Sequence, residues 1–154
     1  MANKLYVAYG SNLNLAQMAR RCPTAKVVGI GNLKDYQLMF RRVATIEPEK
    51  GAVTPVGVWE ITPTDELALD RYEGYPSYYR KETVTVTMRG GEEKQAMVYI
   101  MNAGEPMMPP MGYYETILQG YGDVGLDPKY LQAALNDTKK RMRVRYSWGH
   151  KCNY

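Results

Sequence analysis

Cysteine and histidine are scarce in this chain of 154 residues. The two cysteines, Cys22 and Cys152, lie far apart in the sequence, which fits neither a disulfide framework nor a zinc cluster. We expect both to be free thiols. The single histidine, His150, gives little support for a histidine-based triad or a multi-histidine metal site. Any chemistry is therefore expected to come from carboxylates, hydroxyls and the backbone.

Long hydrophobic runs are also missing. No segment approaches the roughly 20 apolar residues of a membrane-spanning helix, so no membrane association is expected. The N-terminus begins directly with a strand-like pattern, without the basic and then apolar regions of a signal peptide. These features predict a cytoplasmic protein. The length suits one domain, which would bury roughly two-thirds of the surface exposed by the unfolded chain.

Acidic residues are absent from the C-terminal end. Residues 139–154 contain six Lys and Arg and no acid, whereas residues 1–138 contain 14 basic and 16 acidic residues, a balance of −2. The net charge of +4 therefore comes from the tail. Its interleaved aromatic residues could contact RNA or an anionic membrane. A solvated helix end is the simpler interpretation, so we expect no nucleic-acid partner. We divide the chain into a domain, 1–138, and a basic aromatic tail, 139–154.

A strand, a tight loop and a helix start are predicted near the N-terminus. Leu5 to Tyr9 is β-prone and mostly apolar, and helical spacing begins near Leu13, with Asn12 or Asn14 as a possible cap. Gly10 would allow a turn with positive φ and would let a ligand approach main-chain N–H groups. Such groups suit a carboxylate, a phosphate or a developing oxyanion. The alternative is a loop that only turns the chain.

The strongest pattern farther along is a β-hairpin. Residues 83–88 alternate strictly between Thr and apolar residues, and Gly90-Gly91 connects them to a second strand, 95–101. Thr62 followed by Pro63 and acids predicts a capped helix start. A short strand or a turn is expected at 27–31, and strands at 36–40 and 56–61. Loops are expected at 48–55 and 102–112, and helices at 113–121, ended by Gly120 and Gly122, and at 128–143.

A second informative stretch runs from Asp70 to Arg80. Gly74 is a natural helix stop, which places Glu73 at a helix C-terminus among four tyrosines. The helix dipole and apolar surroundings both raise the proton affinity of a carboxylate there, which suits a general base. The alternative is an exposed glutamate paired with Arg71 or Arg80.

These features together resemble the γ-glutamylcyclotransferase-like superfamily, which includes the AIG2-like proteins. The resemblance covers roughly residues 5–135. It is carried by Tyr9 to Leu13 after a strand, Arg21-Cys22-Pro23, Asp35-Tyr36, Leu69 to Gly74, Tyr78-Tyr79-Arg80, Pro109 with Tyr113, Ile117 and Gly120, and Gly125-Leu126 with Tyr130. The order and spacing of these short motifs are specific to the superfamily but not to one substrate.

The resemblance implies an α+β fold, a small mixed β-barrel-like sheet with flanking helices. It also implies a reaction in which the α-amine of a γ-glutamyl group attacks its own γ-carbonyl, giving 5-oxoproline and a free amine or amino acid. In that reaction Glu73 would be the general acid/base and no metal or cofactor is needed, because the nucleophile belongs to the substrate.

The resemblance also implies where the substrate binds. The backbone of Gly10, Ser11 and Asn12 would hold the substrate carboxylate or the oxyanion. Tyr6, Tyr9 and Tyr113 would line the pocket.

Two alternatives remain open from the sequence. A module of the same fold could bind a small carboxylate without turnover, or the tail could bind nucleic acid or an anionic surface. Either a monomer or a homodimer is compatible with the sequence.

Overall fold

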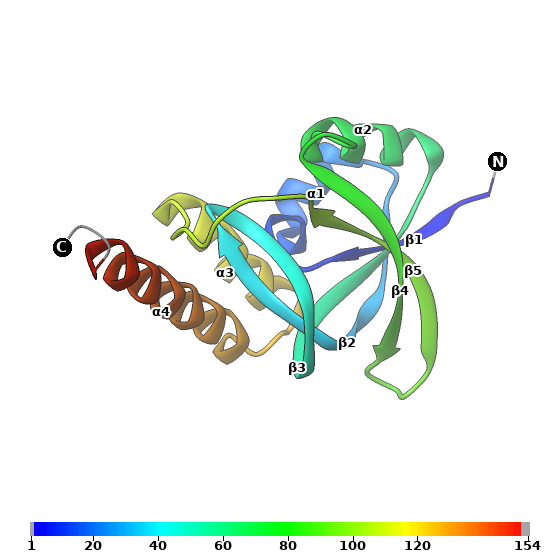
Figure 1. Ribbon diagram of the computed structural model, residues 1–154. Helices are drawn as coiled ribbons and strands as arrows, with labels where there is room; N and C mark the ends of the chain where they lie inside the picture. The colour runs from blue at the N-terminus through cyan, green and yellow to red at the C-terminus, as the bar shows by residue number, and fades with distance from the viewer. Residues whose placement is uncertain (1, 152–154) are drawn as a thin grey trace.

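A closed five-stranded barrel forms the centre of the molecule, with helices around it (Figure 1). The computed structural model describes residues 2–151, with side chains for residues 2–143. The strand order is β1-β3-β2-β4-β5. The strands are β1 (Lys4–Ala8), β2 (Lys26–Arg41), β3 (Val43–Ile61), β4 (Tyr79–Met88) and β5 (Glu93–Met101); the helices are η1, a 3-10 turn (Ser11–Leu13), α1 (Leu15–Arg21), α2 (Pro63–Glu73), α3 (Met111–Val124) and α4 (Lys129–Lys151). This arrangement confirms the predicted α+β barrel.

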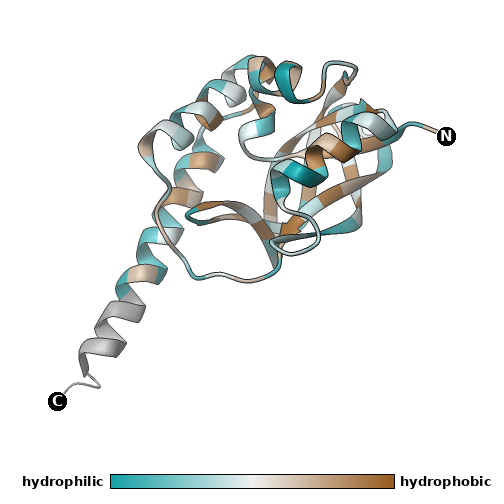
Figure 2. Ribbon diagram, turned by 90° about the horizontal axis from the view of Figure 1, so that it is seen from above, coloured by the Kyte–Doolittle hydropathy of each residue, from teal (hydrophilic) through white to brown (hydrophobic). Residues whose placement is uncertain are grey.

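Strand β1 closes the barrel. It pairs with β3 in antiparallel fashion from Lys4↔Ile61 to Ala8↔Gly57, and with β5 in parallel at Tyr6↔Met97. The predicted hairpin of β4 and β5 is confirmed, with Val84 and Val86 buried between exposed or half-buried threonines. Hydrophobic and hydrophilic positions alternate along the barrel strands (Figure 2). This alternation fills the barrel interior with apolar side chains.

The β2–β3 hairpin differs from the prediction. The short strand or turn expected at 27–31 and the strand expected at 36–40 form one strand, and the loop expected at 48–55 is wrong because β3 continues through it. The chain reverses instead at Arg42, where φ is 69°. Pro48 and the following residues are accommodated by a register shift opposite Asp35, whose carboxylate accepts the Gly51 N–H at 2.8 Å. A strand can absorb such turn-forming residues when an irregularity displaces them from the ladder.

Helix α3 also differs from the prediction. It continues through Gly120 and Gly122 and ends at Gly125, where φ is 83°. Gly120 serves packing, because a Cβ there would lie 2.6 Å from the Asn14 backbone nitrogen and 2.7 Å from the Leu13 carbonyl carbon. The glycine lets α3 pack directly against η1.

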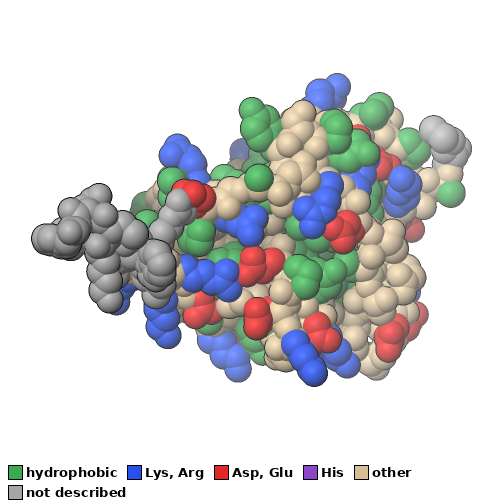
Figure 3. All heavy atoms as spheres, viewed as in Figure 1, with side chains coloured by type: hydrophobic (Ala, Val, Ile, Leu, Met, Phe, Trp, Pro, Cys, Tyr) green, Lys and Arg blue, Asp and Glu red, His purple; other side chains and the backbone are tan. Residues whose placement is uncertain are grey.

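Helix α4 packs on the β2 side of the barrel and then extends away from it (Figures 1 and 2). The boundary expected after Thr138 falls inside this helix, whose backbone continues to Lys151. Tyr146, Trp148, His150, Cys152 and Tyr154 lie outside the described side chains. On the face in Figure 3, Lys and Arg are interspersed with Asp and Glu. In the described part of the chain, no helix is both long and apolar enough to cross a membrane.

Candidate active site

A cavity of about 270 Å³ lies where β1 ends and α2 ends. It brings together every site residue predicted from the sequence, although they come from distant parts of the chain. Its walls are Tyr6, Val7, Tyr9, Gly10, Ser11, Asn12, Val43, Ala44, Tyr72, Glu73, Tyr79, Tyr99 and Tyr113.

The loop after β1 forms one wall of the cavity. The expectation of a positive φ at Gly10 is wrong, because φ is −128°. Space explains the glycine instead, since a Cβ would lie 3.2 Å from the Ala44 Cβ and 3.6 Å from the Tyr113 hydroxyl. Of the two candidate caps, Asn14 is the one that caps α1, accepting the Gln17 N–H at 3.1 Å. Among the described residues, the N–H groups of residues 10–12 have no hydrogen-bond acceptor.

Side chains of this loop connect it to β1 and to the end of α2. The Ser11 and Tyr72 hydroxyls are 2.9 Å apart, and the Asn12 amide donates to the Tyr6 hydroxyl at 2.9 Å. The Arg21 guanidinium donates to the Asn12 side-chain oxygen and lies 3.4 Å from the centre of the Tyr72 ring. The loop is therefore held in one position relative to α2 before any ligand binds.

Glu73, the last residue of α2, forms another part of the cavity wall. Gly74 ends the helix in the left-handed conformation, with φ at 65°, as the sequence predicts. Burial raises the pKa of the Glu73 carboxyl to about 7, against the opposing effect of the Arg21 charge. Within the part of the chain that is described, Glu73 forms no ion pair, and Arg80 binds Glu82 instead. Near neutral pH this carboxyl can both accept and donate a proton.

Tyrosine hydroxyls fix the remaining walls. The Tyr113 oxygen accepts the Ala44 N–H at 3.0 Å, and Tyr79 donates to the Ala44 carbonyl at 2.8 Å. Tyr9 donates to the Tyr99 carbonyl at 2.7 Å. Burial raises the pKa of Tyr9, Tyr79 and Tyr113 above the ordinary value, so these hydroxyls stay neutral.

Several wall residues were not predicted. Tyr72 and Tyr79 lie inside the motif that surrounds Glu73, so their proximity could have been suspected from the sequence. Arg21 is not a wall residue but contacts two of them, Asn12 and Tyr72; it also lies in a motif, and its contact with Tyr72 depends on how α1 packs against α2. No local pattern distinguishes Ala44, whose role rests on both of its backbone polar groups.

Comparisons with known proteins agree with this geometry. The model of the family described as "Gamma-glutamyl cyclotransferase, AIG2-like" matches residues 6–116. The γ-glutamylcyclotransferase of Bos taurus is 31% identical over 145 residues, covering 86% of this chain and 77% of that protein. The human γ-glutamylcyclotransferase is 30% identical over 139 residues, covering 82% and 74%.

A solved structure described as a γ-glutamyl cyclotransferase has the same fold. It superimposes with a TM-score of 0.78 at 27% identity and covers 86% of each chain. The sequence match and the shared barrel show that this chain belongs to the γ-glutamyl cyclotransferase, AIG2-like family.

Proposed function

We propose that the protein is a γ-glutamylcyclotransferase that converts a γ-glutamyl compound into 5-oxoproline and a free amine or amino acid. The observation that carries this proposal is the position of Glu73. Its carboxyl, with a pKa of about 7, lines the same small cavity as residues 10–12, whose N–H groups have no acceptor among the described residues. Such a cavity suits a reaction that moves protons and develops negative charge on oxygen.

Each step uses groups that are present in the cavity. Glu73 takes a proton from the substrate α-ammonium group, and the amine nitrogen then attacks the γ-carbonyl carbon. The N–H groups of residues 10–12 stabilise the oxyanion or hold the α-carboxylate. The bond from this carbon to the leaving nitrogen breaks as Glu73 returns the proton to that nitrogen. The ring nitrogen then gives its second proton to the Glu73 carboxylate, which passes it to the departing amine, so 5-oxoproline and an ammonium group are released. No water, metal or cofactor enters the reaction, because ring closure is unimolecular once the substrate is folded back.

The tyrosines shape the space in which the substrate folds. Tyr6, Tyr9 and Tyr113 are buried or half-buried and their hydroxyls stay neutral, so they supply hydrogen bonds without adding charge. Fixed hydroxyls of this kind can hold the γ-glutamyl chain in the bent conformation that ring closure needs.

The test is direct detection of the product. The purified protein is incubated with γ-glutamyl amino acids, γ-glutamyl-lysine and glutathione, and 5-oxoproline is measured by mass spectrometry. Glu73→Gln keeps the shape of the side chain but cannot exchange the proton, so we expect turnover to fall by about two to four orders of magnitude. Glu93→Gln, a change at the exposed first residue of β5, outside the cavity walls, is the matched control with unchanged turnover.

The alternative is a binding module of the same fold. It predicts no 5-oxoproline from any substrate, together with saturable binding of a γ-glutamyl compound to the wild-type protein. Equal turnover by wild type and a folded Glu73→Gln variant would rule out Glu73 as the acid/base.

A further inference from the structure

A second cavity, of about 530 Å³, adjoins the first one. The two share Val43, Tyr72, Glu73 and Tyr79 as walls. The second cavity lies between the end of α2, the tip of the β2–β3 hairpin and the segment that follows β5. Glu73 therefore stands at the boundary between two spaces.

Two arginines, Arg41 and Arg71, also line this second cavity. Arg71 lies in the last turn of α2 and is exposed, and its side chain has no hydrogen bond or ion pair to any described residue. Neither arginine pairs with Glu73. Arg71 is thus available to a ligand.

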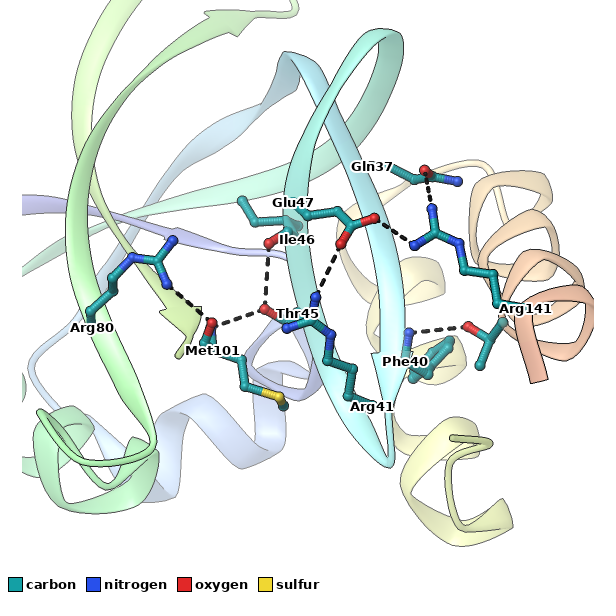
Figure 4. Close-up of polar contacts among 10 residues, drawn as sticks. Gln37, Phe40, Arg41, Thr45, Ile46, Glu47, Arg80, Met101 and Arg141 are labelled. Atoms are coloured by element: carbon teal, nitrogen blue, oxygen red, sulfur yellow. Dashed lines mark hydrogen bonds and ion pairs between the residues drawn. The ribbon is translucent and has the colours of Figure 1, made fainter. Parts of the chain in front are cut away.

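Arg41 is held in place and keeps unused hydrogen-bonding capacity. Its guanidinium binds the Glu47 carboxylate at 3.1 Å, and the other Glu47 oxygen binds Arg141 of α4 at 2.7 Å (Figure 4). One carboxylate is therefore shared by two guanidinium groups, which leaves an excess positive charge. The Nε atom of Arg41 is buried without a hydrogen-bond partner among the described residues. A ligand in the cavity would therefore contact the accessible part of this side chain, which is 20% exposed, and not the covered Nε.

We propose that this second cavity receives the leaving group and that Arg41 and Arg71 select leaving groups that carry a carboxylate. This inference rests on the proposed function. Glu73 returns a proton to the leaving nitrogen, so that nitrogen must lie beside Glu73. With the γ-glutamyl group in the first cavity, the rest of the leaving group extends into the second. Arginine recognises carboxylates through charge-assisted hydrogen bonds.

The proposal distinguishes substrate classes by charge near the scissile bond. In a γ-glutamyl amino acid, the leaving nitrogen and the carboxylate are attached to the same carbon. A γ-glutamyl amine has no such carboxylate, and in γ-glutamyl-ε-lysine the carboxylate is a whole side chain away. Arg41 and Arg71 favour the first class.

A matched pair of substrates tests this. γ-L-Glutamyl-L-alanine and γ-L-glutamyl-L-alaninamide differ only in the leaving-group carboxylate, and kcat and KM are measured for 5-oxoproline release from each. We expect the wild type to prefer the carboxylate by about tenfold or more in kcat/KM. Arg71→Gln, at an exposed position, is expected to raise KM for γ-glutamyl-alanine about tenfold and to leave the alaninamide unchanged. Arg41→Gln should act in the same direction.

Arg20→Gln removes an equal charge from an exposed position on α1 and should preserve the preference. Equal kcat/KM for the two substrates in the wild type would overturn the selection by Arg41 and Arg71 while leaving the cyclisation intact. An undiminished preference in both arginine variants would overturn it as well. No 5-oxoproline from either substrate would remove the proposed function, and this inference with it.

Discussion

The pKa of the Glu73 carboxyl, about 7, predicts how the rate of cyclisation depends on pH. A pKa of about 7 means that the carboxylate, which accepts the proton, is lost as the pH falls through 7. The substrate α-ammonium group has a pKa of about 8, and above it the reacting pair no longer holds the proton needed by the leaving nitrogen. We therefore expect a bell-shaped profile of kcat/KM with limbs near pH 7 and pH 8. Rates of 5-oxoproline formation from pH 5 to 10 test this, and an acidic limb near 4.5 would contradict it.

The raised pKa of Glu73 also lowers the stability of the folded protein at neutral and higher pH. Because the folded-state pKa of Glu73 is raised from 4.5 to about 7, ionisation destabilises the fold, so its stability falls as the pH rises from 4.5 to 7 and stays lower above 7. Glu73→Gln removes that cost. At pH 8 we expect the variant to unfold with a free energy about 1–3 kcal/mol higher than the wild type, after allowing for partial exposure of the carboxyl. Urea unfolding at pH 8 and pH 5 measures the difference, which should shrink at pH 5; an equal difference at both would contradict the assignment.

For single residues, the sequence predicts the position of those whose role depends on their immediate neighbours in the chain. Glu73 is placed by the Gly74 helix stop, and the loop of residues 9–12 by the change from strand to helix. The contacts of Arg21 and Ala44 depend on packing between distant segments, which no local pattern contains. Gly10 shows the difference well: the change from strand to helix draws attention to this glycine, but the structure explains it by close packing and not by a positive φ.

The packing of α3 against η1 supports the active-site loop. A Cβ at position 120 would overlap the backbone of Leu13 and Asn14, so Gly120→Ala must push the helix away from the turn. We expect a loss of about 1–3 kcal/mol in unfolding free energy and reduced turnover. Gly122→Ala is the control in the same helix, since a Cβ there has open space. It should stabilise the protein by about 0.5–1 kcal/mol through helix propensity. Thermal unfolding of both variants tests this prediction. Equal shifts of the unfolding temperature, with the same sign, would contradict the packing argument.

Element boundaries follow local chemistry only where nothing distant competes with it. The capping box of Thr62 and Asp65 starts α2 as predicted, and the alternating threonines form β4. Residues 48–55 look like a loop, yet Pro48 and residues 53–55 pair with β2 and keep the segment in strand, while residues 49–52 form the irregularity between them. The glycines of α3 look like stop signals, yet contact with η1 requires one of them inside the helix. In both cases tertiary contacts outweigh propensity.

The closed barrel brings the two halves of the site together. Ser11 and Tyr72 are 61 positions apart in the chain, yet their hydroxyls meet because β1 lies between β3 and β5. The order of strands is not their order in the sequence, so this meeting cannot be read from spacing. The resemblance to a known family implied that the loop of residues 10–12 and Glu73 act in one site, but not the contact between Ser11 and Tyr72, which follows from the topology.

Thr138 attaches helix α4 to strand β2 of the barrel. Its buried hydroxyl donates to the Ala134 carbonyl at 2.8 Å and accepts the backbone N–H of Phe40 at 3.2 Å. Thr138→Val keeps the shape but leaves the Phe40 N–H without its acceptor, so we expect a loss of about 1–3 kcal/mol in unfolding free energy.

Thr138→Ser keeps the hydroxyl and removes one methyl group, so it should cost less, about 1 kcal/mol. Urea unfolding of both variants gives the two values. A larger loss for Ser than for Val would mean that the methyl group, and not the hydrogen bond, attaches α4 to β2. If the hydrogen bond attaches α4 to β2, Thr138→Val should also weaken the ion pair between Arg141 and Glu47. The preference for γ-glutamyl-alanine over its amide should then fall together with the free energy of unfolding.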